Sequence, residues 1–272
     1  MNKKWINVLV ILSFLGLFSC AKDSHKSASS TWKEGAKPQD TLLLDTDPDY
    51  NKAALINVEL GLGYLSQGQV TRAKTKLTHA VDLAPNLPET HSAMAHFLEM
   101  VGEFAESEKE YKKAVKLSNG GAVYNNYGAF LCRRNRFKEA DKAFHQALED
   151  KQYPRTAEIY ENAGLCALKW PDQEKAREYF KTALRRDPNR LTALLELVDI
   201  DVKQGEFFEA QSLLDHYKNN AELSARSLWL GIQVAKGLND DVSVASQALM
   251  LKNLFEDSPE YQLYLRSEKA TR

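Results

Sequence analysis

Two stretches of the chain decide its fold: GAVYNNYGAFLCRRNRFKEADKAFHQALEDKQYP at residues 121–154 and AEIYENAGLCALKWPDQEKAREYFKTALRRDPNR at residues 157–190. Small and aromatic residues stand at the same offsets in both, and the pattern continues outward with a period of about 34 residues. Position 8 is small in most units (Gly61, Ala95, Gly128, Gly164), position 20 is alanine in four of them (Ala73, Ala140, Ala176, Ala210), and position 24 is aromatic or leucine (Leu77, Tyr111, Phe144, Phe180, Leu214). A small residue lets two helices approach closely, and the large residue one turn after the alanine fills the space between them. The sequence therefore predicts stacked helix hairpins, each with a first helix, helix A, and a second, helix B.

This spacing resembles the tetratricopeptide repeat. The resemblance predicts an all-α, right-handed superhelix, an α-solenoid of about six helix hairpins, spanning residues 51–272. We expect repeats at about 54–87, 88–120, 121–154, 157–190, 191–220 and 224–257, then a capping helix at 258–269. In the last repeat Leu230 and Gly231 keep the pattern. Ala245 and Leu249 come two residues late, so we expect the register to be lost there.

The N-terminus has the composition of a targeting segment. Lys3 and Lys4 precede an apolar run from Trp5 to Phe18, which is too short for a comfortable membrane span and is typical of a signal peptide. The run ends at Cys20 in a stretch that resembles the lipobox of bacterial lipoproteins. We expect residues 1–19 to be a lipoprotein signal peptide and Cys20 to be acylated. An ordinary signal peptide and an uncleaved anchor are the alternatives.

Two further expectations concern the chain after Cys20. Lipoproteins retained in the inner membrane often carry Asp after the cysteine, whereas this chain has Ala21, so the resemblance implies the periplasmic face of the outer membrane. Several acyl chains on one residue would give stable anchoring. Residues 20–50 are rich in Ser, Lys, Asp and Thr and predict a flexible linker, in which Leu42–Leu44 is the one apolar cluster.

Composition and motifs argue against several function classes. The chain has 36 basic and 37 acidic residues and a formal net charge of −1, so it lacks the basic excess of nucleic-acid-binding proteins. The scattered histidines and paired carboxylates fit a solvated helical surface, and no HExxH, CxxC, GxGxxG or P-loop motif occurs. We therefore expect a protein that is not an enzyme, with no cofactor, metal ion, nucleic acid or small-molecule substrate.

Two cysteines besides Cys20 lie on helix A of adjacent repeats. Cys132 stands at position 12 of its repeat and Cys166 at position 10. Neighbouring helices pack about 8–10 Å apart, so a disulfide can form in an oxidising compartment. The alternative is two buried free thiols that pack as small apolar groups, and the sequence analysis favours this alternative.

The binding surface of such a stack is the concave wall formed by helix A residues at positions 2, 5, 9, 12 and 13. From these positions we expect a partner groove lined by Leu55, Val58, Leu62, Leu65, His96, Asn125, Ala129, Arg133, Leu165 and Leu168. The first repeat is unusually apolar for a solvent-facing wall, which favours docking of a partner helix or strand by apolar anchors. The alternative is that Leu42–Leu44 covers it.

Four segments give a more specific resemblance: Tyr124–Cys132 (YNNYGAFLC), Tyr160–Leu168 (YENAGLCAL), Leu228–Ile232 (LWLGI) and Ser258–Tyr261 (SPEY). With the lipobox and about six repeats, they resemble the type IV pilus biogenesis lipoproteins of the PilF/PilW family. The resemblance implies a pilotin, a lipoprotein that helps the secretin subunit reach the outer membrane and assemble into a ring. The alternative is a lipoprotein adaptor for a periplasmic cell-wall enzyme complex.

Overall fold

The computed structural model describes residues 49–170 and 172–270, and within them every regular element is an α-helix. The helices are α1 (Tyr50–Ser66), α2 (Val70–Leu83), α3 (Pro88–Met100), α4 (Phe104–Leu117), α5 (Gly121–Arg133), α6 (Phe137–Glu149), α7 (Thr156–Lys169), α8 (Gln173–Arg186), α9 (Leu191–Gln204), α10 (Phe207–Asn220), α11 (Ala225–Gly237), α12 (Asp241–Leu254) and α13 (Pro259–Ala270). The expected signal peptide, the acylated Cys20 and the expected linker up to residue 48 lie outside the described residues.

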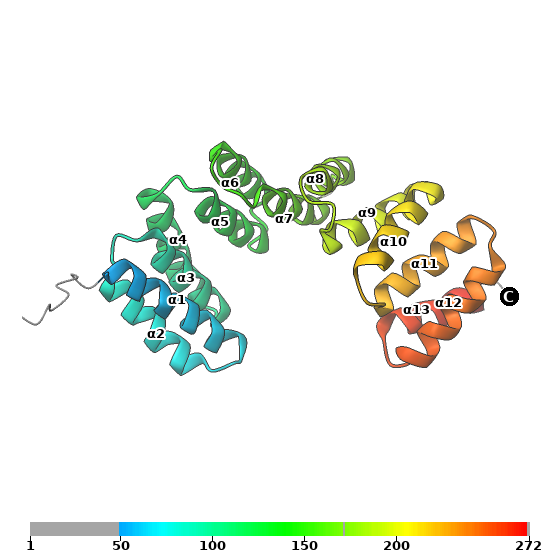
Figure 1. The fold of residues 1–272 in the computed structure, drawn as a ribbon, viewed down its shortest axis with the longest axis horizontal. Helices are drawn as coiled ribbons and strands as arrows, with labels where there is room; N and C mark the ends of the chain where they lie inside the picture. The colour runs from blue at the N-terminus through cyan, green and yellow to red at the C-terminus, as the bar shows by residue number, and fades with distance from the viewer. Residues whose placement is uncertain (1–48, 171, 271–272) are drawn as a thin grey trace, which may run out of the picture. The chain divides into compact units, whose positions relative to one another are not determined.

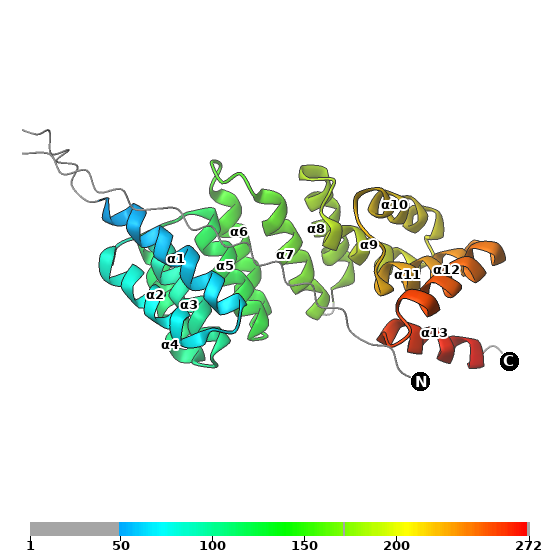
Figure 2. The same cartoon turned by 60° about the horizontal axis from the view of Figure 1, so that its bottom comes forward.

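The helices pair into hairpins that follow one another along the chain (Figures 1 and 2). Each odd-numbered helix from α1 to α11 packs against the next even-numbered one, and each helix A also contacts the helix A of the following hairpin. Each helix B contacts the next helix A as well. The prediction of an all-α superhelical repeat is therefore confirmed.

The first helix begins earlier than the expected first repeat. Asp49 caps α1, because its carboxylate accepts a hydrogen bond of 3.0 Å from the backbone N–H of Lys52. This cap satisfies one of the unpaired N–H groups at the helix start and extends the helix back to Tyr50.

Close packing at position 8 explains why that position is small. A Cβ atom on Gly164 would lie 2.7 Å from a ring carbon of Phe180, and one on Gly128 would lie 2.8 Å from the ring of Phe144. Both phenyl rings are fully buried, so they have little room to move aside. The glycine of helix A and the aromatic of helix B therefore lock the two helices of one hairpin together.

Replacing Gly164 by alanine should lower the free energy of unfolding by about 1–3 kcal/mol, because the added methyl group overlaps the buried ring of Phe180. Gly63→Ala is the matched control: it also lies inside a helix, and no atom lies within 4 Å of its added Cβ. That control should leave stability unchanged or raise it by up to ~1 kcal/mol. Urea unfolding of both variants checks the prediction, and equal midpoints would contradict it.

The expected loss of register in the last repeat is wrong. Gly231 faces Gln247, and the sequence separation of that pair equals the separation of Gly164 and Phe180. The hairpin α11–α12 therefore keeps the register and differs in residue type, with a glutamine where the other repeats carry an aromatic or leucine. Gln247 is buried, and its Oε1 atom has no hydrogen-bond partner.

Five of the turns between helix A and helix B contain a left-handed residue. Gly68, Gly102 and Gly205 have φ values of 72°, 85° and 79°, and Asn135 and Asn239 fill the same role at 60° and 56°. Glycine reaches this region without strain, and asparagine tolerates it better than most residues. This geometry ends helix A and reverses the chain within two or three residues.

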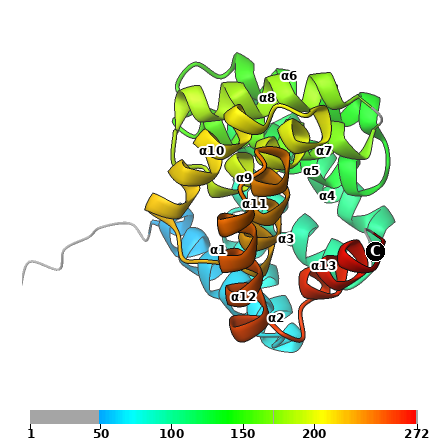
Figure 3. The same cartoon turned by 90° about the vertical axis from the view of Figure 1, so that its right-hand side faces the viewer.

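The C-terminal helix occupies the place of one more helix A. α13 contacts both α11 and α12, and Figure 3 shows these three helices toward the viewer. Tyr261 of α13 joins Leu228, Ile232 and Leu251 in a buried cluster. The last full hairpin is therefore covered on the side where a following repeat would pack.

Cys132 and Cys166 form a disulfide that joins α5 to α7. The expectation of two buried free thiols is therefore wrong. Their Cα atoms are 5.7 Å apart, inside the range that a disulfide spans, because consecutive A helices approach closely at these positions. The bond staples the third hairpin to the fourth.

Within the described part of the chain, no helix combines the length and the apolar character needed to cross a membrane.

Candidate groove on the A helices

A groove of about 470 Å³ runs across the A helices of the first four hairpins. It is lined by Val58, Leu62, Glu89, Ser92, Ala93, His96, Tyr111, Ala122, Val123, Asn126, Ala129, Arg133, Arg155 and Asn162. Five of these were predicted from their repeat positions: Val58, Leu62, His96, Ala129 and Arg133. The groove therefore brings together side chains from α1, α3 and α5 that were placed on one wall from the sequence.

The other five predicted groove residues do not line it. Leu55 is 44% exposed on α1, and Leu65 packs against the core cluster around Leu77 and Phe97. Leu165 and Leu168 are half-buried against the core of the fourth hairpin. Asn125, on α5, is only 1% exposed.

In the third repeat, position 5 makes a buried polar contact between consecutive A helices. The Nδ2 of Asn125 donates to Glu158 Oε1 at 3.1 Å, and Asn125 Oδ1 accepts from Asn162 Nδ2 at 3.0 Å. The next residue, Asn126, reaches the groove instead and donates to Ser92 Oγ at 3.1 Å. Sequence reasoning missed Asn126 and Asn162 as lining residues. Their repeat positions differ by one from the expected wall.

Glu99 and Arg133 form a forked ion pair beside the groove. Arg133 Nε donates to Glu99 Oε1 at 2.6 Å, and Arg133 Nη2 donates to Glu99 Oε2 at 2.7 Å. Nδ1 of His96 lies 4.0 Å from the same carboxylate. Burial raises the pKa of Glu99, but the hydrogen bonds and charges of Arg133 and His96 outweigh it and lower that pKa to about 2. The pair ties α3 to α5 and fixes the position of the guanidinium on the groove wall.

This pair predicts a specific pH dependence. Because the folded-state pKa of Glu99 is depressed, its stabilisation is present above the unfolded pKa of about 4.5 and is lost as pH falls toward 2. Glu99→Gln should therefore cost about 1 kcal/mol at neutral pH, a value discounted for the half-exposed Arg133. The difference from the wild type should shrink between pH 5 and about 2.

Denaturant unfolding at several pH values measures this difference. Glu106→Gln, which removes an exposed carboxylate paired to Lys109, is the control and should change stability by a few tenths of a kcal/mol. A Glu99→Gln difference that stayed constant across the pH range would contradict the assignment.

The groove mixes apolar and polar side chains along its length. Val58, Leu62 and Val123 are apolar, whereas Asn126 and Arg155 are polar. Such a surface can bury apolar side chains and also orient a polar segment by amide and guanidinium hydrogen bonds. This arrangement suits a peptide segment better than a small molecule.

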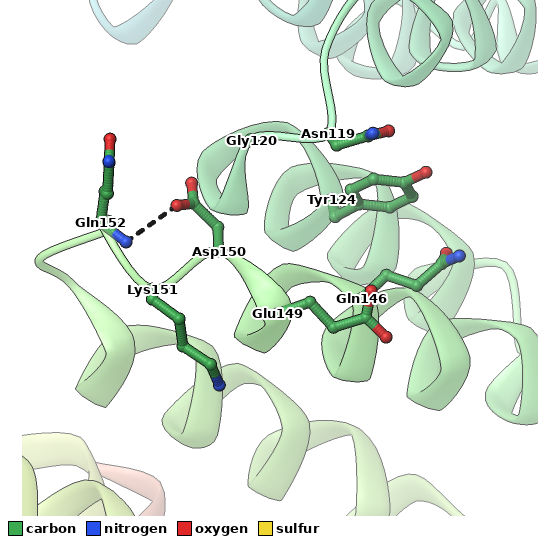
Figure 4. A pocket seen from close by; sticks show the side chains of 8 residues that line it. All are labelled: Asn119, Gly120, Tyr124, Gln146, Glu149, Asp150, Lys151 and Gln152. Carbon is green, nitrogen blue, oxygen red and sulfur yellow. Dashed lines mark hydrogen bonds between the residues drawn. The ribbon is translucent and has the colours of Figure 1, made fainter.

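A larger pocket of about 700 Å³ lies on the third repeat, at its boundary with the second (Figure 4). The carboxylate of Asp150, which lines this pocket, accepts hydrogen bonds from the backbone N–H groups of Gly121 at 2.8 Å and Gln152 at 3.0 Å. These bonds lower the pKa of Asp150 and cap the start of α5. The pocket is lined by polar side chains around one ring, that of Tyr124, and Asp150 is committed to the fold. We therefore place the candidate site in the groove.

Within residues 49–170 and 172–270, no three His, Cys, Asp or Glu side chains come together as a metal-binding group.

Comparison with known proteins points to one group of relatives. Two tetratricopeptide repeat family models match residues 121–189 and 172–227. The type IV pilus assembly protein PilF of Pseudomonas aeruginosa is 36% identical over 220 residues, which cover 80% of this chain and 87% of the relative. The solved structure of Pseudomonas aeruginosa PilF superposes with a TM-score of 0.71 at 34% identity, covering 80% of this chain and 99% of that one. PilW, described as a widely conserved type IV pilus biogenesis factor, superposes with a TM-score of 0.70 at 25% identity, covering 79% and 99%.

Proposed function

The chain belongs to the PilF/PilW family of tetratricopeptide-repeat proteins of type IV pilus biogenesis, and we propose that it acts there as a pilotin, an outer-membrane lipoprotein that binds the secretin subunit. In this role the protein is a binding scaffold and carries out no chemical reaction. The lipid on Cys20 supplies the membrane address, and the A-helix groove supplies the binding surface.

The observation that supports this proposal is the groove that α1, α3, α5 and α7 build together. Val58 and Leu62 give apolar anchoring positions, and Arg133, fixed by Glu99, gives a positioned guanidinium. A segment of a partner protein docked there would bury apolar side chains and pair its backbone or acidic groups with the polar lining residues.

The first experiment concerns the membrane address. The membranes of cells expressing the wild type or Cys20→Ala are fractionated. Secretin multimers are detected in each fraction by their resistance to dissociation into monomers. With equal amounts of the repeat protein, the variant should leave the secretin monomeric or in the wrong membrane. Unchanged secretin multimers in the variant and in a full deletion would exclude the pilotin role and favour the cell-wall adaptor.

The second experiment concerns the groove. Val58→Asp with Leu62→Asp should abolish secretin assembly while leaving the lipoprotein in place, because two carboxylates would have to be buried by the docked segment. Leu254→Asp is the matched control, since Leu254 is 60% exposed at the end of α12 and lies outside the groove. Equal assembly in both variants would place the secretin site elsewhere.

A further inference from the structure

The solvent face of α12 differs from that of every earlier helix B. Its exposed residues at positions 19, 22 and 26 are Val242, Ala245 and Leu249, spaced so that they lie on one side of the helix. The corresponding residues of the earlier hairpins are Arg72, Thr75 and His79; Glu106, Lys109 and Lys113; Glu139, Lys142 and Gln146; Lys175, Glu178 and Thr182; and Glu209, Ser212 and His216. The earlier hairpins fold with mostly polar residues at these positions. The apolar residues of α12 are therefore not needed for the fold of a hairpin.

Phe208 of α10 extends this apolar surface. Phe208 and Val242 are each 80% exposed, and no other large apolar side chain among the described residues is as exposed. Phe208 stands at position 18 of its hairpin and Val242 at position 19 of the next one. The ring of the preceding residue, Phe207, packs on Gly237 at the end of α11, where an added Cβ would lie 2.2 Å from it. This contact places the start of α10 beside the turn that leads into α12. We define the C-terminal apolar patch as Phe208, Val242, Ala245 and Leu249.

The rest of the fold does not cover the patch. α13 packs on α11 and α12 through Tyr261, which joins Leu228 and Leu251 of those helices. Leu249 is still 59% exposed with α13 in place. Exposed apolar side chains that gather on one edge are typical of an interaction surface.

The rim of the patch is acidic. Glu206, Glu209, Asp240 and Asp241 are exposed at the starts of α10 and α12. Three cations near them are paired with other carboxylates: Lys203 with Asp199 at 2.6 Å, Lys236 with Glu268 at 2.7 Å, and Arg177, whose charge also interacts with Glu206, with Asp201 at 2.8 Å. A surface of this kind repels anionic lipid headgroups and attracts a cationic partner.

We propose that the C-terminal apolar patch docks a helix of a second partner protein, one with an apolar stripe flanked at one end by lysine or arginine. The spacing of Val242, Ala245 and Leu249 matches a helix laid along α12, and the four carboxylates meet the basic end of that helix. This surface belongs to the last two hairpins, whereas the groove belongs to the first four. The protein thereby links two partners.

The test uses the purified protein and two synthetic helical peptides with the same leucine stripe, one with lysines at one end and one with glutamates there. The lysine peptide should bind at least about tenfold more tightly than the glutamate peptide, and its affinity should fall as salt is added. Val242→Ser with Leu249→Ser should weaken lysine-peptide binding by about tenfold or more. Met100→Ser, at a residue that is 62% exposed on the second hairpin, is the matched control and should leave binding unchanged.

The proposal is overturned by equal binding of both peptides, by no binding of the lysine peptide, by an equal loss in the Met100→Ser control, or by binding to vesicles of zwitterionic and anionic phospholipid in preference to the peptides. Self-association of the wild type that the patch variant abolishes would also overturn it, because the occupant would then be a second copy. Circular dichroism of each variant shows that the helices are intact.

Discussion

Removing the disulfide between Cys132 and Cys166 should lower the free energy of unfolding by about 3–4 kcal/mol. The bond closes a loop of 34 residues, and a cross-link of that length removes much of the conformational freedom of the unfolded chain. Cys132→Ala with Cys166→Ala is the suitable variant, because both positions are buried and a hydroxyl group there would lack a partner.

Denaturant unfolding of the double variant and of the wild type, with and without a thiol reductant, measures this effect. The reduced wild type should unfold at nearly the same denaturant concentration as the double variant. The double variant itself should be insensitive to the reductant. Coincident curves for the oxidised wild type and the double variant would show that the bond adds no stability.

The second large effect is expected at Glu161, which is 6% exposed on α7. Its carboxylate accepts hydrogen bonds from Nη2 and Nε of Arg190, the latter at 3.2 Å, and from the backbone N–H of Ala193 at 3.2 Å. Glu161→Ala leaves the guanidinium without its counter-charge and the start of α9 without a cap. The free energy of unfolding should fall by about 2–4 kcal/mol, a range reduced because Arg190 is partly exposed.

The matched control for this prediction is Asp199→Ala. Asp199 pairs with Lys203 at 2.6 Å on the surface of α9, and exposed pairs of this kind contribute about 0–1 kcal/mol. Thermal unfolding of both variants compares a buried ion pair with an exposed one in the same part of the fold. Equal losses would mean that burial of Glu161 adds nothing.

The hairpins were predictable from the sequence because their packing is local. Gly164 meets Phe180 within one hairpin, so the small and large residues recur at a fixed separation and can be read without knowing the neighbours. Gly231 and Gln247 are separated in the sequence by the same number of residues as Gly164 and Phe180. The register of the last hairpin is therefore visible in this separation, although glutamine replaces the usual aromatic residue or leucine.

The groove was only partly predictable because it depends on contacts between hairpins. Asn125 and Glu161 share position 5 and look exposed on a single helix, but the next helix A covers both. Likewise, Cys166 stands at position 10, which is also buried at Phe130 and Ile200. Cys166 faces the preceding hairpin, where Cys132 lies, and this contact between hairpins is set by the packing of consecutive A helices.

The disulfide between α5 and α7 also has a mechanical consequence. A chain pulled from its two ends can extend by at most about 3.3–3.6 Å per residue, and the 34 residues closed by the bond cannot take part. The oxidised chain would therefore stretch about 110 Å less than the reduced one. Under tension, unravelling could proceed inward from either end and would halt at the middle of the stack, leaving a loop that only breakage of a covalent bond releases.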